Sequence, residues 1–148
     1  MRICHIADIH LRLFQRHDEF SHVFSNLYTS LKENNVDLIV IVGDLFHSKL
    51  HLSPEAILLA KEFLKNLSDI AKVIIIPGNH DTIVNQKQRK NSIRAIVSRI
   101  DIPKDRLMLF DKSCLFEYDN TTSFGVFALN DEENFPIKFE NNKNKKYI

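Results

Sequence analysis

Polar side chains that can bind a metal ion follow three separate apolar runs of this sequence. The three polar motifs are Asp8-Ile9-His10, Gly43-Asp44 and Gly78-Asn79-His80-Asp81. The runs before them are rich in β-branched residues and read as buried strands. Because ligands of an open α/β sheet bind beyond the carboxyl ends of its strands, we expect the motifs to meet at one edge of a sheet. This topology brings Asp8, His10, Asp44, Asn79 and His80 to that edge as candidate metal-binding residues.

The types of these side chains indicate which metals the edge would accept. Carboxylate, amide oxygen and imidazole suit Mn, Fe or Zn, and the absence of thiolate argues against a structural zinc site. One carboxylate can bridge two metal ions that lie about 3.5–4 Å apart. Asp44 belongs to the middle motif and is the natural bridge.

Each motif taken alone has a plain structural explanation. Asp-x-His at a strand end is commonly a turn or a helix cap, and Gly-Asp ends many strands. The sequence holds three glycines, however, and both Gly43 and Gly78 stand immediately before a candidate ligand. Glycine permits tight turns and close approach of the backbone to a ligand. The three motifs together, in order at successive strand ends, favour a functional site.

The elements around the motifs alternate between strand and helix. Expected strands are Arg2–Ala7, Asp37–Val42 and Val73–Ile76, and expected helices are Asp18–Asn34, one beginning at Ser53-Pro54, and Gln88–Arg99. The pattern β-α-β-α-β-α predicts an α/β domain with a mainly parallel sheet over residues 1–100. For residues 101–148 the sequence pattern predicts short strands (Arg106–Phe110, Cys114–Tyr118, Ser123–Leu129) and a polar loop. At Tyr147-Ile148 it predicts the first residues of another strand.

Composition limits the classes that remain. The 148 residues suit one domain, and a net charge of +1 excludes a strongly basic arm or an acidic tail. No run approaches the ~18 apolar residues that cross a bilayer, and no signal peptide opens the chain, so no membrane partner is expected. Two cysteines, Cys4 and Cys114, offer no disulfide framework and favour the cytoplasm.

The three motifs resemble those of the calcineurin-like metallophosphoesterase superfamily. Gly43-Asp44-Leu45-Phe46-His47 is similar to the SbcD-type, meiotic-recombination-type (MRE) DNA-repair nucleases. The resemblance extends from Met1 to about Ser98. It implies a layered α/β/β/α sandwich, incomplete here, within one nuclease domain over residues 1–148. It also implies hydrolysis of phosphodiester bonds at DNA ends, as exonuclease or endonuclease.

The resemblance assigns a role to each candidate residue. Asp8 and His10 would hold a first divalent ion, Asp44 would bridge to a second, and Asn79 would hold the second. Mn is the ion that the family implies, with Fe, Mg or Zn as alternatives. The catalytic residues would be His80 over the scissile phosphate, His47 near the substrate, and Asp81, which would orient His80 by a hydrogen bond.

The resemblance also implies partners. These are DNA, an SbcC-type ATPase subunit for the full-length protein, and a second copy of the chain in a homodimer. Basic residues that could meet the DNA backbone are Arg12, Arg16, Lys49, Lys87, Arg89 and Lys90, although each could equally be a solvated surface charge. The Ile, Asn and Lys bias suggests an AT-rich bacterial or phage genome.

One departure from the family pattern is large. The family uses three later histidines as ligands, whereas all seven histidines of this chain lie at or before His80. We therefore expect the chain to be the N-terminal part of a longer nuclease. Two other functions stay open: a small-molecule phosphatase or phosphodiesterase on the same scaffold, and a catalytically incomplete binding or dimerisation fragment.

Overall fold

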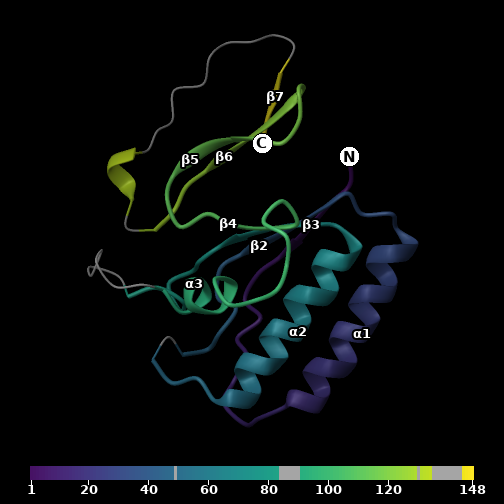
Figure 1. Ribbon diagram of the computed structural model, residues 1–148, viewed down its shortest axis with the longest axis vertical. Coiled ribbons are helices and arrows are strands. Elements are labelled where there is room, and N and C mark those ends of the chain that lie inside the picture. Colours follow the sequence, from purple (N-terminus) through teal and green to yellow (C-terminus); the bar gives the residue numbers. More distant parts are fainter. Residues whose placement is uncertain (49, 84–90, 130, 135–144) are drawn as a thin grey trace.

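The computed structural model describes residues 1–48, 50–83, 91–129, 131–134 and 145–148 (Figure 1). Its first sheet contains four parallel strands in the order β1-β2-β3-β4. These are β1 (Ile3–Ile6), β2 (Leu38–Val42), β3 (Lys72–Ile76) and β4 (Leu107–Leu109). The prediction of a parallel sheet is confirmed, and the strand expected around residues 106–110 completes it.

Two long helices cover one face of this sheet. They are α1 (His17–Glu33) and α2 (Pro54–Ile70), and Figure 1 shows them packed side by side. Helix α2 begins as the sequence predicts, because Ser53 is its N-cap and accepts a hydrogen bond from the Ala56 N–H at 3.2 Å. No helix in the described part of the chain has the length and apolar character needed to cross a membrane.

The third helix is shorter than the sequence predicts. The apolar pattern predicts a helix over Gln88–Arg99, but α3 spans Ser92–Val97. Asn91 has an extended backbone, and its side chain accepts a hydrogen bond from the Arg94 N–H at 2.6 Å. This cap starts the helix at Ser92. Residues 88–90 lie outside the described part of the chain.

A second sheet lies on the other face of the first (Figure 1). Strands β5 (Cys114–Glu117) and β6 (Thr122–Val126) pair antiparallel, and β7 (Lys146–Tyr147) pairs parallel with β6. A short 3-10 helix, η1 (Glu132–Asn134), follows β6. The described residues thus form helix, sheet and sheet layers of the expected α/β/β/α sandwich.

Alternation along β2 explains the two cores. Ile39 and Ile41 belong to the core beneath the helices, whereas Leu38 and Val40 pack with Phe124 of β6 between the sheets. All of these side chains are buried, as expected for a strand that is covered on both faces. The helix-side core therefore packs against the sheet whose strand ends carry the polar motifs.

Phe63 of α2 is the aromatic centre of the helix-side core. Its ring is fully buried and stacks on Phe24 of α1 with the ring centroids 4.0 Å apart. We expect Phe63→Ala to lower the free energy of unfolding by about 3–5 kcal/mol, because it leaves a cavity between the two helices. Urea unfolding followed by circular dichroism measures this, with exposed Leu58→Ala on the same helix as the control. An equal loss in both variants would contradict this packing.

Candidate metal centre

Three of the candidate metal ligands share an unusual backbone conformation. Asp8, His10 and Asp44 have φ angles of 55°, 52° and 56°, in the left-handed region that residues other than glycine rarely adopt. Gly43, beside Asp44, has φ of 85°. Strained backbone of this kind persists only where the surrounding structure fixes it, and it concentrates at functional sites. No sequence pattern at Asp8 or His10 indicates this strain.

Backbone hydrogen bonds between the first two motifs hold this conformation. The N–H of His10 donates to the Asp44 carbonyl at 2.9 Å, and the N–H of Leu11 donates to the Leu45 carbonyl at 2.9 Å. The N–H of His47 in turn donates to the Leu11 carbonyl at 3.0 Å. The chain therefore continues to pair beyond β1 and β2, and this pairing fixes the spacing of the candidate ligands.

Three of the predicted metal ligands converge. The His10 Nε2 atom lies 3.5 Å from Asp8 Oδ1 and 4.0 Å from Asp44 Oδ2. Donor–metal distances of about 2.0–2.2 Å place two donors of one ion no more than about 4 Å apart. Both His10 distances fit that limit, the three donor atoms all lie within 4.8 Å of one another, and their nitrogen and oxygen atoms suit a borderline divalent ion. Asn79, the fourth predicted ligand, is exposed and lines a cavity of about 280 Å³ together with His47 and His80.

Three imidazoles gather beside the carboxylates. Ring nitrogens of His10, His47 and His80 lie within 4.8 Å of one another. The ring centroids of His10 and His80 are 4.8 Å apart, and those of His47 and His80 are 5.8 Å apart. Partial desolvation, followed by electrostatic repulsion from the neighbouring Arg12, His10 and His80 side chains, lowers the pKa of His47. The site thus combines a pair of carboxylates with a cluster of imidazoles that suits an anionic substrate.

Two glycines let the second and third motifs approach each other. A Cβ atom on Gly78 would lie 2.2 Å from Asp44 Oδ1 and 2.8 Å from the Gly43 Cα. The same Asp44 oxygen accepts a hydrogen bond from the His80 N–H at 2.8 Å, which leaves Oδ2 on the His10 side. The placement of glycine at positions 43 and 78 therefore has a steric explanation at this contact.

Asp81 does not make the hydrogen bond to His80 that the family resemblance implies. Its carboxylate, 1% exposed, accepts hydrogen bonds from the N–H groups of Leu45, Phe46 and Gly78 at 3.3, 3.2 and 3.0 Å. The His80 ring instead contacts the His47 carbonyl, with Nδ1 2.7 Å from that oxygen. The Asp81 carboxylate binds these backbone N–H groups, which would otherwise be buried without hydrogen-bond partners.

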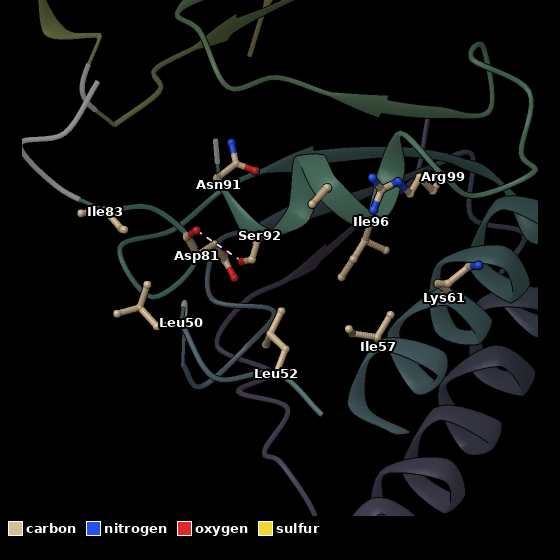
Figure 2. Close-up of a pocket in the computed structure, with 11 residues that line it drawn as sticks. Leu50, Leu52, Ile57, Lys61, Asp81, Ile83, Asn91, Ser92, Ile96 and Arg99 are labelled. Atoms are coloured by element: carbon tan, nitrogen blue, oxygen red, sulfur yellow. Dashed lines mark hydrogen bonds between the residues drawn. The ribbon is translucent and has the colours of Figure 1, made fainter. Parts of the chain in front are cut away.

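Asp81 also lies beside a separate cavity. Figure 2 shows Asp81 at its wall next to Ser92, whose hydroxyl donates to the Asp81 carbonyl at 3.3 Å. The cavity has a volume of about 350 Å³ and is walled largely by apolar side chains of α2, α3 and the loop at Leu50. Burial raises the pKa of Asp81, and the backbone N–H groups oppose that rise. The hydrogen bonds of Asp81 thus join the third polar motif to the residues that follow the second.

The predicted DNA-contacting residues divide into three groups. Arg12 is exposed and has no acidic partner in the part of the chain that the structure describes. Arg16 is exposed but pairs with Glu19, with its Nε atom 2.8 Å from Glu19 Oε2. The remaining four, Lys49, Lys87, Arg89 and Lys90, lie outside the described residues.

Two residues near the site are not indicated by the sequence. Phe14 and His51 line a second cavity of about 280 Å³, which also has Arg12 and His47 in its wall. His51 reads from the sequence as a surface or helix-packing residue, and the loop that carries Phe14 has no periodic pattern. No signal in the sequence could have placed either residue beside His47.

Comparison with known proteins agrees with this geometry. Residues 1–147 match the calcineurin-like phosphoesterase family. An uncharacterised protein of Acanthamoeba polyphaga mimivirus is 39% identical over 134 residues, which cover 88% of this chain and 10% of that protein. The DNA double-strand break repair protein Mre11 of Methanopyrus kandleri is 35% identical over 104 residues (65% of this chain, 22% of that protein). One subunit of the nuclease SbcCD of Bacillus subtilis is 38% identical over 89 residues (55% of this chain, 22% of that protein).

The chain therefore spans less than a quarter of the length of each of these three relatives. The family match, by contrast, covers nearly every residue of the chain and includes all three polar motifs. The chain belongs to the calcineurin-like phosphoesterase family.

Proposed function

We propose that the chain acts as a two-metal-dependent DNA nuclease of the SbcD type, which hydrolyses phosphodiester bonds at DNA ends during repair or recombination. The observation that carries the proposal is the convergence of Asp8, His10 and Asp44 beside the imidazoles of His47 and His80. The names of the Mre11 and SbcCD relatives support DNA as the substrate. In this proposal residues 1–148 belong to one nuclease domain, with the metal-holding part in residues 1–100.

The donor set supports divalent cations as cofactors. Asp8 and His10 would hold one ion, Asp44 would bridge, and Asn79 would hold the second; we propose Mn²⁺, with Fe, Mg and Zn as alternatives. When bound, such ions neutralise phosphate charge and lower the pKa of a coordinated water. The Nδ1 atom of His10 is buried without a hydrogen-bond partner among the described residues.

The chain's own residues orient the rest of the site. The His47 carbonyl can only accept, so the Nδ1 atom of His80 carries the proton in their 2.7 Å contact. The Nε2 atom of His80 is then the atom free to donate to the leaving oxygen, provided that the ring is protonated. The His80 N–H also holds Asp44 Oδ1, so the same residue positions the bridging carboxylate.

We also propose the partners that the relatives suggest. These are an SbcC-type ATPase, since one relative is itself named as a subunit, and a second copy of the chain. Helix α2 offers exposed Leu58 for such an interface. We place the protein in the cytoplasm, where the free thiols of Cys4 and Cys114 would stay reduced.

His47 separates a nuclease from a small-molecule phosphatase. Since it lies at the boundary of the two cavities, we expect His47→Ala to reduce Mn²⁺-dependent cleavage of end-labelled linear DNA by about 100-fold or more. Hydrolysis of a small aryl phosphate ester should fall much less, because that substrate reaches only the metal edge. His22→Ala, an exposed histidine on α1, is the matched control. Equal losses on both substrates would favour the phosphatase, and absence of activity in the wild type would favour the incomplete binding fragment.

A further inference from the structure

Phe14 is an exposed aromatic residue beside the candidate metal centre. Its side chain is 72% exposed, the largest exposed fraction among the described large hydrophobic residues. It lines the cavity of about 280 Å³ whose wall also includes Arg12, Gln15, His47 and His51. His47 and His51 also line the cavity of Asn79 and His80, so the Phe14 cavity adjoins the metal edge.

Two hydrogen bonds hold the loop that leads into Phe14. The Arg12 carbonyl lies 2.6 Å from His17 Nε2, and the Ser53 hydroxyl donates to the Leu13 carbonyl at 2.5 Å. Leu11, at the start of the loop, is 2% exposed and pairs with Phe46 in an isolated bridge. Because the backbone before Phe14 is held in place, binding a ligand there costs little loop ordering.

The charge beside Phe14 favours an anionic ligand. The guanidinium of Arg12 has no acidic partner among residues that the structure describes, in contrast to Arg16, which Glu19 neutralises. Arg12 is also close enough to His47 to lower its pKa. The cavity thus offers one flat apolar ring and an unneutralised cation within reach of the same histidine.

We propose that Phe14 and Arg12 form a binding platform for one unpaired nucleotide, with the base stacked on Phe14 and a phosphate on Arg12. This inference rests on the proposed nuclease function and specifies its substrate as a DNA end with an unpaired terminal nucleotide. A paired base exposes only its edge, whereas an unpaired base offers a face for stacking on an aromatic ring. Phe14 would therefore select single-stranded or frayed ends, and Arg12 would add affinity without sequence preference.

Binding experiments test the platform separately from catalysis. The probe is a single-stranded oligonucleotide with 2-aminopurine at its terminus, titrated without metal, and the competitor is a blunt duplex with clamped G·C ends. Base–aromatic stacking predicts that Phe14→Ala weakens single-strand binding by about 5- to 150-fold and duplex binding by about twofold or less. Phe14→Trp should restore both the affinity and the quenching of 2-aminopurine. Phe127→Ala, which removes another exposed phenylalanine at the end of β6, is the control and should bind as the wild type does.

The outcomes separate this inference from the proposed function. Equal affinities of Phe14→Ala and wild type for the single strand would overturn the platform, and so would equal losses for single strand and duplex. The first of these results would make the exposed ring a protein-contact residue instead. Cleavage of DNA by the wild type together with unaltered binding by Phe14→Ala would overturn the platform and leave the nuclease function standing. Absence of Mn²⁺-dependent cleavage in the wild type would sink the nuclease function.

Discussion

Asp44→Asn is expected to lower Mn²⁺-dependent hydrolysis of linear DNA by at least about 100-fold, since changes to partners of metal ligands already cost 10–100-fold. Asn keeps the size of the side chain, and its carbonyl oxygen can still accept the hydrogen bond that His80 N–H donates to Asp44 Oδ1. The substitution removes the negative charge on the Oδ2 side, which faces His10 Nε2 at 4.0 Å. The loss should therefore come from the metal site and not from the fold.

The matched control for Asp44→Asn is Asp69→Asn. Asp69 is an exposed residue of α2 whose carboxylate lies 3.4 Å from the Lys65 ammonium, so its loss should change stability by only a few tenths of a kcal/mol. DNA cleavage by the two variants is measured beside their thermal unfolding. Cleavage by Asp44→Asn at the rate of Asp69→Asn would rule out Asp44 as a metal ligand.

Gly78→Ala is expected to impair both folding and metal binding. The new Cβ would lie 2.2 Å from Asp44 Oδ1 and 2.6 Å from the Asp44 nitrogen, closer than real contacts allow. Backbone atoms such as the Asp44 nitrogen cannot rotate away from the new Cβ, so the two loops must separate. The free energy of unfolding should therefore fall by about 1–3 kcal/mol. The separation moves Asp44 away from His10, so Mn²⁺ affinity should also fall.

The third glycine supplies the comparison for Gly78→Ala. Gly125 lies in β6 of the second sheet, and Gly125→Ala should retain Mn²⁺ binding. Urea unfolding and a Mn²⁺ titration measure the two effects for each variant. Unaltered stability and Mn²⁺ affinity in Gly78→Ala would contradict the close packing of the two loops.

Much of the fold could be predicted because local patterns decide it. Residues 38–41 and 73–75 are buried on both faces of the sheet, and Ser53-Pro54 begins α2 as its capping chemistry predicts. The start of α3 was not predicted, because the apolar positions begin only at Ile93 and do not mark where the Asn91 cap starts the helix. The pairing of β7 with β6 joins residues 146–147 to residues 122–123, a contact that no local pattern encodes.

The residue types of the candidate site could be predicted from the sequence, but the hydrogen bonds that hold its loops in place could not. Parallel topology predicts that Asp8, His10 and Asp44 meet at one edge of the sheet, and the structure brings them together there. The hydrogen-bond partners of Asp81 differ from the expected His80 ring, because hydrogen bonds to buried amides of another loop depend on tertiary structure. The placement of Phe14 beside His47 depends in the same way on the loop that Ser53 and His17 anchor.

The central claim is that the sheet edge at Asp8, His10 and Asp44 holds divalent cations. Titration of the chain with Mn²⁺, with the free ion followed by electron paramagnetic resonance, tests it without requiring any substrate. We expect saturable binding by the wild type and by Asp69→Asn, and loss of that binding in Asp44→Asn. Identical binding curves for the wild type and Asp44→Asn would contradict the account.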